Sequence, residues 1–165
     1  MCIIRFNPFL FYNFSHFIAL HTLLTLSNIV EIPIRFHEVD SMNIVWHGHY
    51  LKYFEIGRES LASFYGFNYS EIFKSGFYTP VIKSICQHKA PLKYGDTAVI
   101  ETTWSELLSA KLVFSYKITR LNDGLLCATG ETTQVFTNLN GELQLICPDF
   151  FENWKMNLKG KLKQN

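Results

Sequence analysis

The amino-acid sequence predicts an α+β fold in which an antiparallel sheet of five or six strands wraps around a long central helix. A mostly apolar helical pattern runs from about His47 to Tyr65, and so apolar a helix should be largely buried. After Gly76 the chain consists of strand-like segments separated by hairpin turn signals. One strand, one long helix and several antiparallel strands can together bury a single core.

The first elements are predicted between residues 30 and 75. Val30 to Phe36 alternates apolar and polar residues, which indicates a strand with one buried face, and Pro33 favours a sheet edge or a strand start. The central helix should end at Gly66, because glycine adopts the left-handed cap conformation at little steric cost. Asn68 to Ser75 is expected to hold a short second helix.

Antiparallel strands are predicted in the second half of the chain. They are expected at residues 79–89, 97–105, 112–119, 125–137 and 142–147. Asn122-Asp123-Gly124 and Asn140-Gly141 are hairpin turn signals, which arrange the later strands as a meander. Asp149 to Leu158 should form a terminal helix, and the sheet is left with an edge that lacks a partner.

The predicted domain covers residues 30–158. It is preceded by an atypical hydrophobic extension, residues 1–29, and followed by a basic tail, residues 159–165. Residues 1–30 contain no acidic residue and one basic residue, Arg5. The extension could be a signal or membrane anchor, an extra helix packed on the domain, or an upstream stretch absent from the natural product. Polar interruptions and the lack of a small-residue cleavage site disfavour a membrane partner.

The composition excludes several classes of function. Hydrophobic residues make up 48% of the chain and the formal net charge is +1, so a nucleic acid or an anionic membrane recognised by bulk charge is not expected. A small-molecule ligand is the better expectation. The four cysteines form no C-x-x-C pair, which argues against a zinc site and a disulfide framework and favours a cytoplasmic location with reduced thiols.

The residues that carry chemistry lie between Asp40 and Arg58. This segment reads D-x-M-N-x-V-x-H-x-x-Y-x-x-x-F-E-x-x-R. It resembles the signature of the 4-hydroxybenzoyl-CoA thioesterase family, whose members are hotdog-fold acyl-CoA thioesterases. The resemblance implies a hotdog fold, hydrolysis of an acyl-CoA, no metal and no redox cofactor, and sites at the interface of a homodimer or of a dimer of dimers.

Asp40 is the expected catalytic carboxylate. The resemblance implies this role, and a carboxylate can either deprotonate water or attack a thioester carbonyl directly. The plain alternative is a turn residue or helix cap. If the helix begins near His47, Asp40 lies seven positions upstream, which is too far for it to cap the helix. No G-x-S-x-G motif and no motif pairing Cys with His is present, so a serine or cysteine acyl-enzyme is not expected.

The start of the helix is the expected oxyanion site. Backbone N–H groups near His47 and Gly48 would stabilise the charge that develops on the thioester oxygen. The His47 imidazole is a candidate for orienting the substrate or moving a proton, with a structural hydrogen bond as the alternative. His47 and His49 alone are weak evidence for a metal.

Three further residues are expected near the substrate. Asn43 stands where many relatives carry glycine; if the loop needs a positive φ, asparagine is the next most tolerant residue. Trp46 and Tyr50 could line an acyl pocket, although core packing explains them equally well. Glu55 and Arg58 are expected to form a structural ion pair. The candidate cations for the phosphates of coenzyme A are Lys83, Lys89, Lys93, Lys111 and Arg120.

The function predicted from the sequence is therefore hydrolysis of an acyl-CoA, or of an acyl group bound to a carrier protein. The alternatives are a hotdog dehydratase or hydratase, in which Asp40 and His47 act on a β-hydroxyl, and a module that binds acyl-CoA without turnover. The identity of the acyl group is not predicted.

Overall fold

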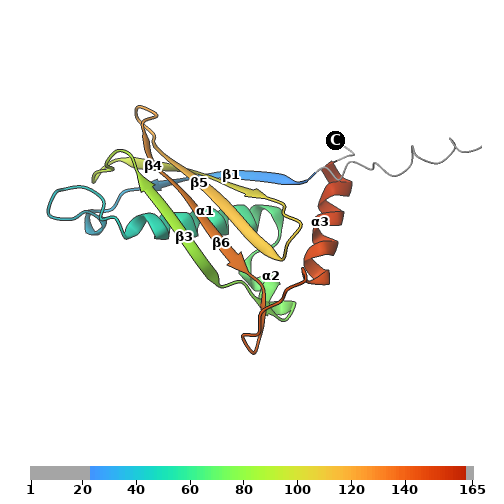
Figure 1. The fold of residues 1–165 in the computed structure, drawn as a ribbon. Helices are drawn as coiled ribbons and strands as arrows, with labels where there is room; N and C mark the ends of the chain where they lie inside the picture. The colour runs from blue at the N-terminus through green and yellow to red at the C-terminus, as the bar shows by residue number, and fades with distance from the viewer. Residues whose placement is uncertain (1–22, 163–165) are drawn as a thin grey trace, which may run out of the picture.

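The computed structural model describes residues 23–162 and has the predicted α+β architecture. A five-stranded antiparallel sheet with the order β1-β4-β5-β6-β3 curves around helix α1, His49–Tyr65 (Figure 1). The strands are β1 (Thr25–Pro33), β3 (Val81–His88), β4 (Thr97–Ser105), β5 (Lys111–Arg120) and β6 (Leu126–Val135).

Helix α1 is held against the concave face of the sheet by its apolar side. Tyr53, Phe54 and Leu61 are almost completely buried in the core. Phe54 stacks on Tyr116 of β5 with ring centroids 4.3 Å apart, and a Cβ atom at Gly130 of β6 would come within 2.2 Å of the Phe54 ring. Glycine in β6 therefore allows the helix to lie close to the sheet. The helix ends as predicted, at Gly66 with φ 76°.

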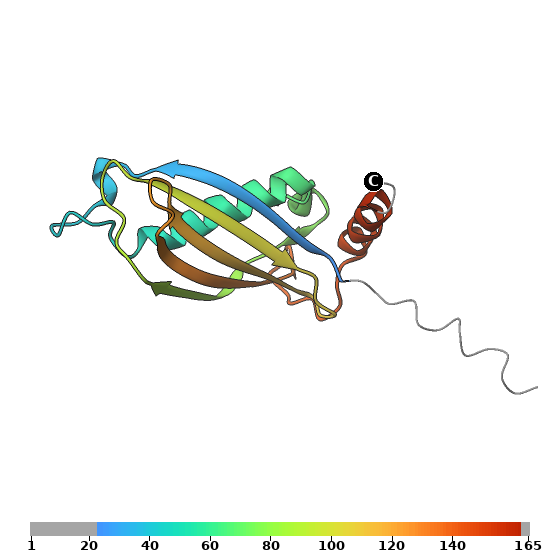
Figure 2. The ribbon, with the colours of Figure 1, turned by 90° about the horizontal axis from the view of Figure 1, so that it is seen from above.

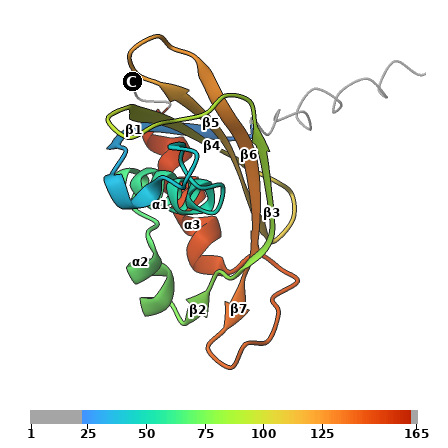
Figure 3. The ribbon, with the colours of Figure 1, turned by 90° about the vertical axis from the view of Figure 1, so that its left-hand side faces the viewer.

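Smaller elements surround this core. Helix α2 (Tyr69–Lys74) is capped by the Asn68 side chain, and β2 (Phe77–Tyr78) pairs with β7 (Thr137–Asn138) in a separate two-stranded sheet. A 3-10 turn, η2 (Phe36–Glu38), precedes the Asp40 loop. Helix α3 (Asp149–Leu162) stands at the end of the sheet opposite that loop (Figure 2), and the view along the sheet shows how the strands curve around α1 (Figure 3).

A buried ion cluster attaches α3 to the domain. The Glu106 carboxylate, 8% exposed, accepts a hydrogen bond from the Leu24 N–H at 2.9 Å and lies 2.8 Å from Lys159 Nζ. Lys155 Nζ lies 3.5 Å from the same carboxylate. The cluster joins the chain before β1, the end of β4 and the terminal helix.

Several predicted boundaries differ from the structure. β1 begins at Thr25, inside the expected extension, and the remainder of that extension, residues 1–22, lies outside the described residues. Residues 142–147 do not form a strand: beyond the turn at Gly141, with φ 85°, a single bridge joins Leu143 to Thr137. α3 continues to Leu162, past the predicted start of the tail, because Lys159 is engaged with Glu106.

The connection between strands also differs from a simple meander. β4, β5 and β6 are consecutive neighbours, but β3 pairs with β6 at the far edge of the sheet rather than with β4. Between residues 23 and 162 no helix has the length and apolar character needed to cross a membrane. The described part of the chain contains three free cysteines, Cys86, Cys127 and Cys147.

Candidate active site

A tight loop fixes Asp40 between β1 and α1. The Asp40 N–H donates to the carbonyl of Ile44 at 2.9 Å, and the Asn43 N–H donates to the carbonyl of Asp40 at 2.9 Å. One carboxylate oxygen of Asp40, Oδ1, accepts the N–H of Met42 at 2.8 Å. Asp40 is thus a turn residue, as the plain alternative held, and its Oδ2 is left without a hydrogen bond in the described structure.

Asn43 has the backbone conformation that the loop requires. Its φ is 57°, and it is the one non-glycine residue with positive φ among residues 23–162. Asparagine tolerates this left-handed region because its short polar side chain can bond locally, whereas most side chains cost roughly 1–2 kcal/mol there. The conditional expectation of a positive φ at this position agrees with the structure.

The turn that leads into α1 presents free backbone donors. The N–H groups of Val45 and Trp46 are used by the carbonyls of Leu92 and Glu38, at 2.8 and 2.9 Å. Those of His47 and Gly48 have no hydrogen-bond partner within residues 23–162. Since α1 begins at His49 with Gly48 as its N-cap, these N–H groups lie at the positive end of the helix dipole.

Asp40 and His47 line one cleft, of about 320 Å³, together with a segment from the end of β3. Lys89, Ala90 and Pro91, which follow β3, also line it. The apolar part of the lining is Met42, Ile44, Val45, Ala90 and Pro91. The cleft therefore combines a carboxylate, free amide donors at its edge and an apolar surface, which are the groups that an acyl ester site needs.

The predicted site residues divide into two groups. Asp40, His47 and Tyr50 line the cleft, whereas Asn43, Trp46 and Gly48 are next to it in the chain but do not line it. The Trp46 indole lies over Gly48, where a Cβ atom would come within 1.9 Å of the ring, and also packs 4.8 Å from the His47 ring. Trp46 and Gly48 thereby shape the start of the helix.

Tyr50 is a buried wall of the cleft. Its side chain is 3% exposed, and burial raises its pKa to about 12, so the hydroxyl remains protonated at neutral pH. The ring packs edge-to-face on His88 with centroids 4.6 Å apart.

His88 and Lys89 come to the site from the sheet. His88 is the last residue of β3, and Lys89 is pinned by a hydrogen bond of 2.8 Å from its N–H to the Cys127 carbonyl. Of the cations proposed for phosphate binding, Lys89 lines the cleft, while Lys83 and Arg120 pair with Glu131 and Asp123. Local sequence patterns could not reveal His88 as a cleft residue, because they do not show that the end of β3 faces the Asp40 loop.

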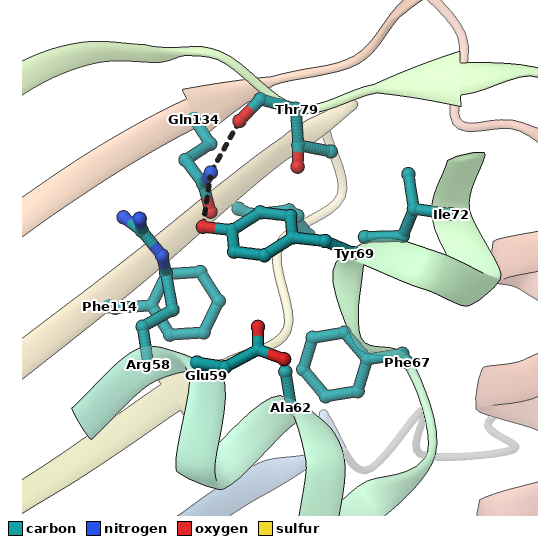
Figure 4. A pocket seen from close by; sticks show the side chains of 10 residues that line it. Arg58, Glu59, Ala62, Phe67, Tyr69, Ile72, Thr79, Phe114 and Gln134 are labelled. Carbon is teal, nitrogen blue, oxygen red and sulfur yellow. Dashed lines mark hydrogen bonds between the residues drawn. The ribbon is translucent and has the colours of Figure 1, made fainter. Parts of the chain in front are cut away.

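Two other hollows are less suited to an acyl thioester. A cavity of about 10 Å³ beside α2, the size of one water, is lined by Arg58, Tyr69 and Gln134 (Figure 4). There the Gln134 amide donates to the Thr79 carbonyl and, at 3.5 Å, to the Tyr69 hydroxyl. A groove of about 740 Å³ beside α3 contains Glu106 and Lys155, whose charges are already paired.

The predicted ion pair of α1 borders the small cavity. Arg58, almost fully buried, donates to Glu55, and Tyr69 donates to the same carboxylate at 3.0 Å. Arg58 also lies over the Tyr69 ring, 5.6 Å from its centroid. The pair joins α1 to α2, which supports its structural interpretation. No group of metal-ligating residues is found between residues 23 and 162.

The sheet curved around α1, with the Asp40 loop at the helix start, defines the hotdog class of proteins. Residues 34–154 match the family model described as the Thioesterase-like superfamily, and the chain belongs to that superfamily. The resemblance noted in the segment from Asp40 to Arg58 is thereby confirmed at the level of the family.

Individual relatives agree with this assignment. The chain is 41% identical over 88 residues to the "Putative acyl-CoA thioesterase YneP" of Bacillus subtilis (strain 168), covering 53% of this chain and 64% of that protein. It spans just under two thirds, 64% to 65%, of the length of the first curated relatives that it matches.

Solved structures share the fold. A hypothetical protein, TT1821 from Thermus thermophilus, superposes with a TM-score of 0.69 at 28% identity, covering 76% of this chain and 95% of that one. A 4-hydroxybenzoyl CoA thioesterase mutant in complex with 4-hydroxybenzoyl CoA gives a TM-score of 0.68 at 20% identity, covering 78% and 98%. At that identity the second likeness shows the fold alone.

Proposed function

We propose that this protein hydrolyses acyl-CoA thioesters to a free acid and coenzyme A. The observation that carries the proposal is the Asp40 carboxylate in one cleft with the start of α1, where the N–H groups of His47 and Gly48 are free. Membership of the Thioesterase-like superfamily and the likeness to a B. subtilis protein named for this activity support it.

In the proposed reaction the thioester carbonyl oxygen lies against the two free N–H groups. Negative charge develops on this oxygen as the carbonyl carbon becomes tetrahedral, and the helix start stabilises it. Asp40 removes a proton from a water molecule whose oxygen attacks the carbon. The C–S bond then breaks, and the departing thiolate takes up a proton to give the CoA thiol.

Asp40 could instead attack the carbonyl itself and form a mixed anhydride. Water would then hydrolyse the anhydride and regenerate the carboxylate. A single turnover in water enriched in heavy oxygen tests for direct attack: an unlabelled product acid together with label in Asp40 means that water attacked the Asp40 carbon of the anhydride, whereas a general base gives labelled acid and unlabelled Asp40. The free Asp40 Oδ2 suits either route.

The central test is thiol release from a panel of acyl-CoAs by the wild type and by Asp40→Asn. Loss of the carboxylate should lower kcat by about 10²–10⁴-fold, the usual range for a general base. Asp123→Asn is the matched control, because Asp123 also accepts the N–H two residues ahead, that of Leu125, at 3.1 Å. Undiminished turnover by Asp40→Asn would remove this residue from the mechanism.

The same assays separate the rival activities. A hydratase would change enoyl absorbance without releasing thiol, and a binding module would retain acyl-CoA with no turnover. Thiol release from an acyl carrier protein at a higher kcat/KM than from the matching acyl-CoA would identify the carrier-bound acyl group as the substrate.

The working unit is proposed to be a homodimer, or a dimer of dimers, formed through β3. This edge strand exposes three apolar side chains, with Val81 42%, Ile82 58% and Ile85 40% exposed. Its one lysine, Lys83, is paired with Glu131 of the neighbouring strand, so its charge does little to prevent another strand from pairing with this edge. A second copy of the chain would cover the exposed edge of β3. We also propose that the protein works in the cytoplasm.

A further inference from the structure

The groove beside α3 gathers exposed apolar side chains from four parts of the chain. Its volume is about 740 Å³, and its walls come from the residue before β1, the β4–β5 connection, the segment before α3 and α3 itself. Leu108 is 94% exposed, and Leu145 and Ile146 are each 84% exposed. The large apolar side chains that line this α3 groove are Leu23, Leu107, Leu108, Leu145, Ile146 and Met156. Such a gathering usually marks a binding surface.

The charged side chains of the α3 groove are paired with one another. Lys159 and Lys155 lie 2.8 and 3.5 Å from the buried Glu106 carboxylate, and Lys155 also lies 2.7 Å from Glu152. Each lysine of the lining therefore has a carboxylate partner within the described domain. An anionic lipid headgroup or an acidic peptide would have to compete with these carboxylates. The groove is better suited to an apolar segment that carries few charges.

Residues 1–22 supply a segment of this composition. They lie outside the described residues, but their sequence contains no acidic residue and one basic residue, Arg5. Five phenylalanines occur between residues 6 and 17, together with several leucines and isoleucines. An aqueous environment is unfavourable for so many large apolar side chains, and burying them against another apolar surface removes both from water.

The segment also leaves the domain at the groove. Leu23 lines the groove, and Leu24 is fixed beside it, because its N–H donates to the Glu106 carboxylate at 2.9 Å and its carbonyl accepts the Glu106 N–H at 2.8 Å. Chain geometry keeps Phe17 within roughly 22 Å of Leu23. A tether this short gives an effective concentration in the millimolar range, about 10³ times that of a second copy at micromolar protein. The chain's own segment is therefore the favoured occupant.

We propose that residues 3–22 fold back into the α3 groove of their own subunit and cover its exposed leucines and isoleucine. Leu145 and Ile146 take part in no strand pairing within residues 23–162, so one wall of the groove is an irregular segment whose apolar side chains point away from the core. The docked segment gives these side chains a partner. Because α3 stands at the end of the sheet opposite the Asp40 loop (Figure 2), docking is independent of the cleft and of the proposed hydrolysis.

Photo-crosslinking of the full chain locates the segment. Benzoylphenylalanine replaces Phe11, Phe14 or Phe17 in separate proteins, and the intact 165-residue chain is verified by mass spectrometry. Irradiation should join the segment to peptides containing residues 106–110, 145–147 or 149–159, in a product with the mass of one chain. A product mapped outside the groove, or no product at any of the three positions, would overturn the proposal.

Proteolysis measures docking in the unlabelled protein. Chymotrypsin cleaves after large apolar residues, and a docked segment is cut only while it is released. Leu145→Ser/Ile146→Ser should make cleavage within residues 1–22 at least about 10-fold faster, because it removes one apolar wall. Equal cleavage rates in this variant and the wild type, with the fold verified by thermal unfolding, would contradict docking.

Leu121→Ser/Leu125→Ser is the matched control for this variant. Both leucines are exposed, and the Leu121 N–H bonds Thr97 at the start of β4, whereas the groove lies beyond the end of that strand. Cleavage within residues 1–22 should therefore keep the wild-type rate. An equal acceleration in the control would show that loss of any exposed leucine pair releases the segment, and would refute a specific site.

The other occupants give different results in the same experiments. A crosslinked product with the mass of two chains would assign the groove to the segment of a second copy. Sedimentation of the full chain with vesicles of phosphatidylcholine and phosphatidylglycerol, together with loss of the one-chain product, would assign it to a lipid surface. Either result overturns the proposal. Thiol release plays no part in these measurements, so failure of the proposed hydrolysis leaves their outcome unchanged.

Discussion

Gly130→Ala is a direct test of how closely α1 must approach the sheet. The new methyl group would lie 2.2 and 2.4 Å from two atoms of the Phe54 ring and 2.8 Å from the carbonyl oxygen of Ile85. Phe54 is 1% exposed and stacked on Tyr116, so it cannot swing away, and the carbonyl belongs to the backbone of β3. The substitution must therefore displace the helix or the edge strand.

The expected cost follows from two opposing effects. Overpacking a core costs about 1–3 kcal/mol. Removing a glycine from a strand interior returns about 0.5–1 kcal/mol. Contacts as short as 2.2 Å put the overpacking cost in the upper part of its range, at about 2–3 kcal/mol. The net loss in the free energy of unfolding should therefore be about 1–2.5 kcal/mol, which lowers Tm by about 2–10 °C for a domain of this size.

Urea and thermal unfolding at fixed protein concentration measure this loss. Gly160→Ala in α3 is the matched control, because nothing lies within 4 Å of its added methyl, and it should be stabilised slightly by helix propensity. A Gly130→Ala protein as stable as the wild type would refute the close approach of α1 to β6.

Three further results are expected. Because φ is 57° at position 43, Asn43→Val should lose roughly 1–2 kcal/mol of stability and most of its activity, whereas Asn43→Gly should keep the loop conformation and the rate. Unfolding curves measure the stability of each variant, and thiol release measures its activity. Gly48→Ala should leave stability nearly unchanged but lower kcat, since the added methyl displaces the half-exposed Trp46 ring that packs on Gly48 and so disturbs the helix start that holds the free N–H groups. Burial alone would raise the pKa of Glu106, but the Lys159 ammonium and the Leu24 N–H bring it below its ordinary value. Its stabilisation is therefore complete above the unfolded pKa of about 4.3 and is lost as the pH falls through the lower folded pKa. Glu106→Gln should cost about 3 kcal/mol at pH 7, and the difference from the wild type should shrink toward pH 3 in urea titrations.

Local sequence patterns were sufficient for the elements that bury one face. Residues 97–105 form β4 with the predicted bounds, and the central helix ends at Gly66 as expected. Such elements are predictable because apolar residues recur along the chain with the period of the helix or strand whose face they bury. Residues 142–147 show the limit: an Asn-Gly turn and apolar residues suggested a strand, but Leu145 and Ile146 are each 84% exposed and pair with nothing.

The candidate site was only partly predictable for the same reason. The segment from Asp40 to Gly48 is continuous in the chain, so its residues could be recognised together. His88 and Lys89 reach the cleft through the placement of β3 at the sheet edge, beside β6. That placement depends on a crossover between distant strands, and no local periodicity encodes it.

The position of β3 also has a consequence for the order in which the chain can fold. During synthesis β3 emerges before β4 and β5, yet its neighbour in the sheet is β6, which emerges after both. The β4–β5 hairpin can close early, but the apolar residues of β3 must wait for a late, distant strand. Newly made chains will therefore expose the apolar residues of β3 until β6 is available. Where several ribosomes translate one message, association of neighbouring nascent chains through β3 should be the main competitor of correct folding.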